Sequence, residues 1–204
     1  MGIPEFTAKY STEFHKAVDA IEVTDDFGKQ LGFTNGIELS VDILLQLQTG
    51  NQRIYIVGNG GSAAIASHAA IDLWKNGGIP SLTFNDSSLL TCISNDIGFE
   101  DVFAAPLEMF ASKGDLVICI SSSGNSADIV KACQTAKQKK CRMITLSGFS
   151  PDNKIRSLGT INFFVPSFSY GFTEIIHQYI LHSILDAKMY CMNAKDIFNK
   201  NLNL

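Results

Sequence analysis

Apolar residues recur at helical spacing over the first fifty positions of the chain and gather into short continuous runs after that. One apolar stripe predicts a helix over residues 7–30, and the Asn-Gly pair at 35–36 is expected to break the helical pattern. A second helix, over residues 37–47, is apolar on too many sides to face solvent. We therefore expect it to pack against another subunit as well as against its own core.

From residue 53 onward the pattern predicts strands that alternate with helices. The run Ile54-Tyr55-Ile56-Val57 is short, apolar and followed by Gly58, which is typical of a buried strand. Further strands are predicted over 81–84, 116–120, 143–146 and 161–165, and helices over 62–74, 87–94, 101–111, 126–139 and from 172 past 187. This alternation predicts a parallel sheet covered by helices on both faces. The expected organisation is a helical segment over 1–50, an α/β domain over 51–190 and a polar tail over 191–204, frayed from 199.

The composition of the chain is typical of a globular protein and argues against a nucleic-acid-binding or membrane-spanning one. The chain has 204 residues, 46% of them hydrophobic and 18% charged, which fits one globular domain with a helical extension. With 16 basic and 20 acidic residues it is unsuited to binding nucleic acid through phosphate contacts. The longest uncharged stretch, residues 54–71, is interrupted by glycines and serines, so we expect no membrane span. Five scattered cysteines without a CxxC pair indicate reduced, buried thiols, and with no apolar signal segment they indicate a cytoplasmic protein.

Two glycine- and serine-rich turns each follow a predicted buried strand and open a helix. The first is Gly58-Asn59-Gly60-Gly61-Ser62 and the second runs from Ser121 to Ser126. In a parallel sheet both lie at the carboxyl ends of strands, where free N–H groups of helix N-termini face a ligand crevice. Either turn alone is better explained as a simple tight turn, with Ser126 as an N-cap. Together they favour an anion site, and because they match neither dinucleotide nor nucleoside triphosphate fingerprints, the anion is expected to be a small phosphorylated molecule.

Histidines and carboxylates suggest a second chemistry. His68 and Asp72 lie four residues apart on one helix, while Glu174 and His182 lie eight apart on the last helix. Two imidazoles and two carboxylates make a possible site for a divalent transition metal.

The histidines and the Asn-Asp pair also have structural explanations that involve no metal or substrate. His68 could be a hydrogen-bonded packing residue, His15 is expected to be exposed, and His177 could form a solvated pair with Glu174. Asn95-Asp96, another candidate, could be an ordinary Asx turn.

Taken in order along the chain, these motifs resemble a known family. The string is Gly58-Asn59-Gly60-Gly61-Ser62-Ala63-Ala64, His68, Ser94-Asn95-Asp96-Ile97-Gly98-Phe99-Glu100-Asp101, Gly114-Asp115 and Ile120-Ser121-Ser122-Ser123-Gly124-Asn125-Ser126. It resembles the sugar isomerase (SIS) superfamily and, more narrowly, the phosphoheptose isomerases. The resemblance implies a flavodoxin-like five-stranded parallel sheet flanked by helices, in a homotetramer with sites at subunit interfaces. It also implies conversion of sedoheptulose 7-phosphate to D-glycero-D-manno-heptose 7-phosphate, the first step of heptose biosynthesis for surface polysaccharide such as lipopolysaccharide or capsule.

The resemblance also assigns roles to residues. It implies that Ser121, Ser122, Ser123 and Ser126 hold the phosphate and that Asn59, Gly60, Ser62, Asn95 and Asp96 contact the rest of the substrate. It implies Zn²⁺, or another divalent metal, on His68, Asp72, Glu174 and His182. Asp72 is then the candidate base and His182 the candidate acid, with Glu174 as a rival base.

Two of the four ligand positions depart from the family pattern. The family's Glu is Asp72 here, and its Gln is Glu174. The family's Arg-Ile-Gln-Glu run reads Phe172-Thr173-Glu174-Ile175, so its Arg and its second acid are missing. A divalent ion with two carboxylates is formally neutral, which would weaken its Lewis acidity.

Two alternative functions follow from the resemblance and its departures. One is a phosphosugar-binding regulatory or adaptor protein without isomerase activity, and the other is an isomerase for a different phosphosugar. His182, beside a complete serine turn, favours an enzyme.

Overall fold

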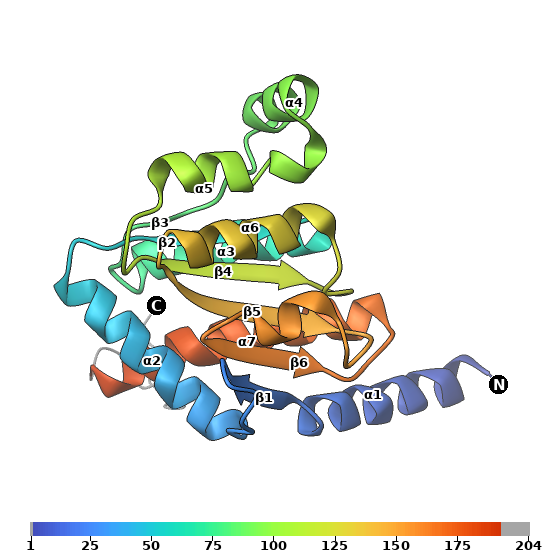
Figure 1. Ribbon diagram of the computed structural model, residues 1–204. Helices are drawn as coiled ribbons and strands as arrows, with labels where there is room; N and C mark the ends of the chain where they lie inside the picture. The colour runs from blue at the N-terminus through green and yellow to red at the C-terminus, as the bar shows by residue number, and fades with distance from the viewer. Residues whose placement is uncertain (1, 193–204) are drawn as a thin grey trace.

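The computed structural model describes residues 2–192 and contains one six-stranded sheet with helices on both faces (Figure 1). The strand order is β1-β6-β5-β4-β2-β3, and every neighbouring pair is parallel except β1 and β6, which run antiparallel. The strands are β1 (Glu22–Asp25), β2 (Ile54–Gly58), β3 (Ser81–Leu82), β4 (Leu116–Ser121), β5 (Arg142–Gly148) and β6 (Ile161–Val165).

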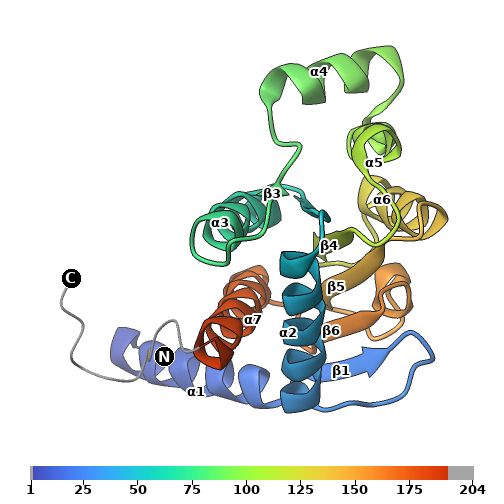
Figure 2. The ribbon, with the colours of Figure 1, turned by 90° about the vertical axis from the view of Figure 1, so that its left-hand side faces the viewer.

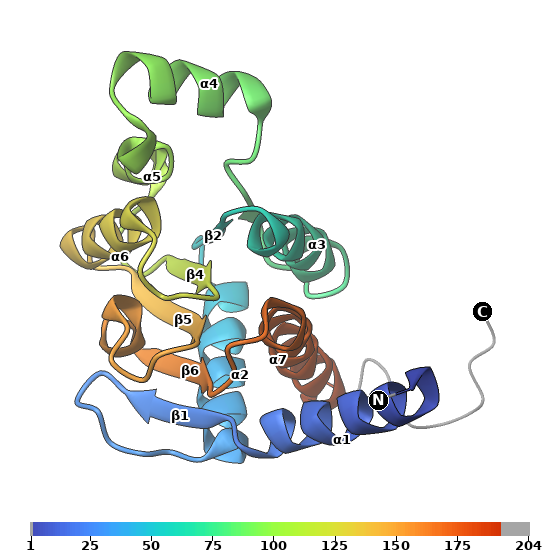
Figure 3. The same ribbon diagram turned by 90° about the vertical axis from the view of Figure 1, so that its right-hand side faces the viewer.

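The helices are α1 (Ile3–Asp19), α2 (Phe33–Thr49), α3 (Gly61–Lys75), α4 (Ser87–Asp96), α5 (Ala104–Phe110), α6 (Ala127–Gln138) and α7 (Tyr170–Cys191), with short 3₁₀ segments η1 (Phe99–Asp101) and η2 (Lys154–Ser157). Helices α2, α3 and α7 cover one face of the sheet and helices α5 and α6 cover the other (Figures 2 and 3). Side chains of α2, α3 and α7 share one core cluster, and side chains of α5 and α6 share the other. Successive residues of β2 point to opposite faces, so Ile54 joins the first cluster and Tyr55 the second.

The parallel α/β architecture is confirmed, and most predicted elements from residue 54 to the last helix lie within a few residues of their observed bounds. The sheet has one strand more than the expected five, because β1 from the N-terminal segment adds to its edge. No helix among residues 2–192 has both the length and the hydropathy to cross a membrane.

The predicted helix over 7–30 is wrong beyond Asp19. The chain turns after α1 and forms β1, in which Val23 pairs with Phe163 and is fully buried. Phe27, which lies within the predicted helix, is 90% exposed in the turn that follows β1. The helical pattern of residues 20–30 is weak, and the segment contains β-branched residues that favour a strand. Pairing with the open edge of β6 and burial of Val23 therefore decide its conformation.

The predicted break at Asn35-Gly36 is also wrong, because both residues lie inside α2. A β-carbon on Gly36 would stand 2.6 Å from a methyl group of Val23 and 3.2 Å from the ring of Phe163. The glycine therefore permits close packing of α2 on the sheet, and it does not interrupt the helix.

The first fifty residues contribute to the same core as the rest of the chain, since Val23 and Leu44 belong to the cluster that includes β2 and α7. All five cysteines are free, but only Cys119 and Cys133 are buried, so the expectation of buried thiols is correct for two of them. The expected frayed end over 199–204 lies outside the described residues.

Candidate active site

A pocket of about 140 Å³ lies at the carboxyl ends of β2 and β4, where the two predicted turns face each other. Hydroxyl and amide groups line most of it, and Glu174 and Tyr170 of α7 complete its wall. The lining residues are Asn59, Ser62, Ile120, Ser121, Ser122, Ser123, Ser126, Tyr170 and Glu174. Because α3 and α6 both begin here, free N–H groups and the positive ends of two helices face one space.

The serine turn packs closely against a neighbouring loop. Gly124 has φ +65, and its N–H donates to the Ser121 hydroxyl oxygen at 3.1 Å. A β-carbon on Gly124 would lie 2.0 Å from Oδ1 of Asn153, so this loop approaches the turn too closely for any side chain. The Ser122 hydroxyl is buried and has no hydrogen-bond partner among the described residues. A buried hydroxyl facing a pocket without a partner is suited to a ligand.

A side-chain hydrogen bond links the two turns. The Asn59 amide donates to Oδ1 of Asp128 at 3.0 Å, and Asp128, in the first turn of α6, is almost completely buried. Burial raises the pKa of the Asp128 carboxyl group, an effect only partly offset by the hydrogen bond from Asn59. Asp128 is not among the site residues expected from the sequence, although its place two positions after Ser126 makes it a possible partner for the first turn.

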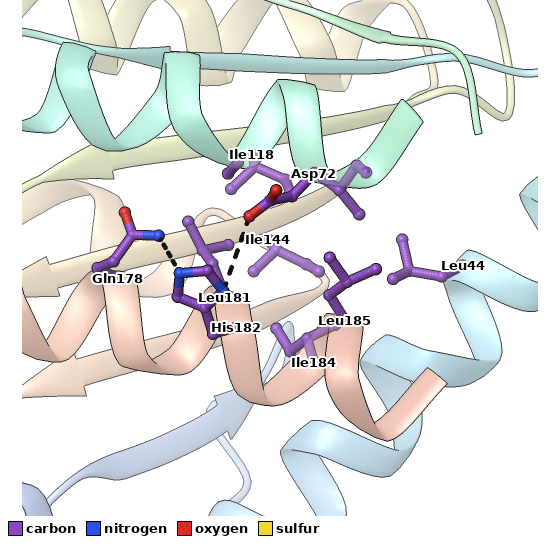
Figure 4. Close-up of a pocket in the computed structure, with 11 residues that line it drawn as sticks. Leu44, Asp72, Ile118, Ile144, Gln178, Leu181, His182, Ile184 and Leu185 are labelled. Carbon is purple, nitrogen blue, oxygen red and sulfur yellow. Dashed lines mark hydrogen bonds and ion pairs between the residues drawn. The ribbon is translucent and has the colours of Figure 1, made fainter. Parts of the chain in front are cut away.

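Three of the four predicted metal ligands meet between α3 and α7. Nε2 of His68 lies 3.0 Å from Oδ2 of Asp72. Nδ1 of His182 lies 3.8 Å from the same oxygen (Figure 4). The ligand atoms of all three residues lie within 4.8 Å of one another. Two imidazoles and one carboxylate at this spacing could hold a divalent transition metal.

Gln178, which the sequence analysis did not select, contacts this cluster directly. Its amide nitrogen lies 2.8 Å from Nε2 of His182, one helical turn away on α7 (Figure 4). Below the cluster the pocket wall is apolar, formed by Leu44, Ala69, Leu73, Ile118, Ile144, Leu181, Ile184 and Leu185 (Figure 4). Asp72, Gln178 and His182 are the polar side chains that border this apolar wall.

The other predicted site residues lie apart from the cluster. The Glu174 carboxylate lies over Gly61, in the serine pocket, and is not part of the group formed by His68, Asp72 and His182. Asn95 and Asp96 end α4, where the Asn95 amide donates to the Asp96 carboxylate at 2.8 Å; both are exposed and neither lines the serine pocket.

Comparison with known proteins decides the family. Residues 19–148 match the SIS domain family model. The chain is 38% identical over 159 residues to phosphoheptose isomerase from Helicobacter hepaticus, covering 75% of this chain and 81% of that protein. It is 31% identical over 173 residues to phosphoheptose isomerase from Escherichia coli O7:K1, covering 82% and 90%. The chain belongs to the phosphoheptose isomerase family of SIS-domain proteins.

The fold comparison agrees with this family assignment. The structure of phosphoheptose isomerase GmhA from Neisseria gonorrhoeae superimposes with a TM-score of 0.80 at 27% identity, over 92% of this chain and 99% of that one. This chain therefore shares its overall fold with a solved phosphoheptose isomerase over almost its whole length.

The remaining histidines differ from one another in environment. His15 is exposed on α1, as expected. His177 is completely buried, so its interpretation as a solvated partner of Glu174 is wrong: Nε2 lies 3.2 Å from the carbonyl oxygen of Ser147 on β5. Burial lowers the pKa of His177 from its usual 6.5 to about 4, which keeps the ring neutral at physiological pH.

Proposed function

We propose that this protein is an aldose–ketose isomerase that converts sedoheptulose 7-phosphate to D-glycero-D-manno-heptose 7-phosphate in the cytoplasm, supplying heptose for surface polysaccharide. The observation that carries the proposal is one helix, α3, that begins at a phosphate-type pocket and carries His68 and Asp72. His68 lies six positions after Ser62 on α3, which corresponds to a rise of about 9 Å along the helix axis. That rise is comparable with the roughly 8 Å of an extended seven-carbon chain, so phosphate and carbonyl ends can reach the two sites together.

The phosphate end is proposed to bind in the serine turn. Ser121, Ser122, Ser123 and Ser126 offer hydroxyl donors, and the N-terminus of α6 adds backbone N–H groups and a favourable dipole. Asn59, Gly60 and Ser62 in the first turn are proposed to contact the adjoining hydroxyl groups. Anchoring the phosphate fixes which carbons of the sugar lie beside the histidine cluster.

The carbonyl end is proposed to react beside Asp72 and His182. Isomerisation moves a proton between C1 and C2 through an enediolate, which requires a base, an acid and a group that stabilises the developing oxyanion. Asp72 is the proposed base and His182 the proposed acid, and Gln178 orients the His182 ring through its contact with Nε2. A divalent metal, zinc in first place, bound by His68, Asp72 and His182, would polarise the carbonyl oxygen. Glu174, whose carboxylate lies over Gly61, is not part of this ligand set.

Association into a homotetramer is proposed from the apolar surface. Ile71 and Trp74 of α3 and Ile175 and Tyr179 of α7 are each more than 40% exposed. Exposed apolar side chains that cluster on neighbouring helices are typical of subunit interfaces.

Helix α4 has no buried residue and stands apart from the sheet in all three views (Figures 1, 2 and 3). Asn95 and Asp96 on α4 are therefore proposed to reach the substrate of a neighbouring subunit.

The decisive experiment compares turnover with binding. Asp72→Asn and His182→Gln are each expected to lower turnover of sedoheptulose 7-phosphate at least about a hundredfold, because each removes a proton-transfer group, while phosphosugar binding survives. His15→Gln serves as the matched control, since His15 is exposed on α1. Unchanged turnover in both variants would refute the assignment.

Elemental analysis and a substrate panel separate the alternative functions. A metal-free, inactive protein that still binds phosphosugars would indicate a regulatory or adaptor protein. Activity on a different phosphosugar would indicate an isomerase with another substrate, the alternative that the altered run Phe172–Ile175 motivates.

A further inference from the structure

The serine pocket contains a carboxylate at the place where an anion is expected to bind. A β-carbon on Gly61 would stand 2.6 Å from both Oε1 and Oε2 of Glu174, so the carboxylate lies directly over the first residue of α3. Glu174 also lines the pocket with Ser121, Ser122 and Ser126. The positive end of α3 therefore already faces a negative charge from the protein itself.

No cationic side chain in the pocket lining compensates that charge. The lining residues include no lysine, arginine or histidine, and within residues 2–192 no hydrogen bond or ion pair is made by the Glu174 carboxylate. A phosphate monoester carries between one and a half and two negative charges near neutral pH. In a pocket partly shielded from water, a carboxylate beside such a group costs more than it would in bulk solvent.

We propose that Glu174 is an electrostatic competitor of the phosphate: its carboxylate occupies the N-terminus of α3 and lowers the affinity of the serine pocket for phosphate groups. This inference rests on the proposed phosphate role of the serine turn. It adds that the pocket releases phosphorylated ligands readily, because a ligand must share the space with Glu174 or displace it. Gly61 allows this arrangement, since any larger residue would push the carboxylate out of the pocket.

Phosphate affinity of the chelator-treated full-length protein tests the proposal. Thermal unfolding is followed as inorganic phosphate increases at constant ionic strength, and the stabilisation yields the dissociation constant. Glu174→Gln removes the charge and keeps the shape, and we expect it to bind phosphate on the order of tenfold more tightly. Prior chelation ensures that any role of Glu174 as a metal ligand contributes nothing to the difference.

A second variant tests the same idea with Glu174 intact. Gly61→Ala places a methyl group against the carboxylate, and is expected to raise phosphate affinity in the wild-type background but not in the Glu174→Gln background. Glu108→Gln, an exposed acid on α5, controls for the change in net charge.

Equal phosphate affinity of wild type and Glu174→Gln would overturn the competitor role, and so would an equal gain from Glu108→Gln. The isomerase assay is a separate readout: activity without an affinity difference leaves the proposed function standing. An affinity difference without activity leaves the competitor role standing and removes the proposed function.

Discussion

The buried ring of His177 makes a prediction about stability that can be worked out from its pKa. His177 has a pKa of about 4 in the folded protein and 6.5 in its usual range. The unfolded chain therefore takes up a proton at higher pH than the folded chain does. Stability from the neutral ring is fully present above pH 6.5 and is lost as the pH falls towards 4. The complete loss is about 3.4 kcal/mol, of which about 2 kcal/mol is lost between pH 7.5 and pH 5.

Urea unfolding at those two pH values, at fixed protein concentration and with chelator, measures this loss. His177→Gln keeps a nitrogen donor for the Ser147 carbonyl but removes the titrating ring. Between pH 7.5 and pH 5 we expect the free energy of unfolding of wild type to fall by about 2 kcal/mol more than that of His177→Gln. His15→Gln should follow the wild-type dependence. A difference between wild type and His177→Gln that stays constant across the two pH values would refute the reasoning.

The remaining predictions concern the two turns of the serine pocket. Asp128→Ala removes the acceptor for the Asn59 amide and should raise KM for the phosphosugar about tenfold. Asp128→Asn keeps an oxygen acceptor, so its KM in steady-state kinetics should stay near the wild-type value. Equal KM values for the two variants would contradict this reasoning. Gly124→Ala forces a β-carbon to within 2.0 Å of Asn153 at φ +65 and should destabilise the protein by at least about 2 kcal/mol. Thermal unfolding checks this against Gly28→Ala, where φ is also positive but nothing lies within 4 Å; equal losses would contradict the steric argument.

The sequence predicted the parts of the structure that depend on local pattern. Short apolar runs such as 116–120 could be assigned as buried strands because all their residues are apolar, and β4 is buried throughout. His68 and Asp72 could be paired because four residues of helix bring side chains together, and they lie 3.0 Å apart.

The parts that the sequence could not predict depend on contacts between distant segments. β1 forms because β6 offers an edge 138 residues later in the chain for Thr24, and no local pattern records that partner. Glu174 and His182 can share a helix face by spacing, but the side chain of Glu174 turns towards Gly61 on α3, a choice set by tertiary packing. Gln178 contacts His182 although its amide side chain carries no chemical signal of its own in the sequence.

The small outer strands have a consequence for aggregation. On one side of the sheet the chain folds back after β1, so that the N–H of Leu31 and the carbonyl of Val23 are already paired with each other at 2.8 Å. On the other side β3 offers only two residues. Neither edge of the sheet therefore presents a long row of unpaired backbone N–H and C=O groups on which another chain could add as a β-strand. We therefore expect concentrated solutions of the folded protein to resist fibril formation.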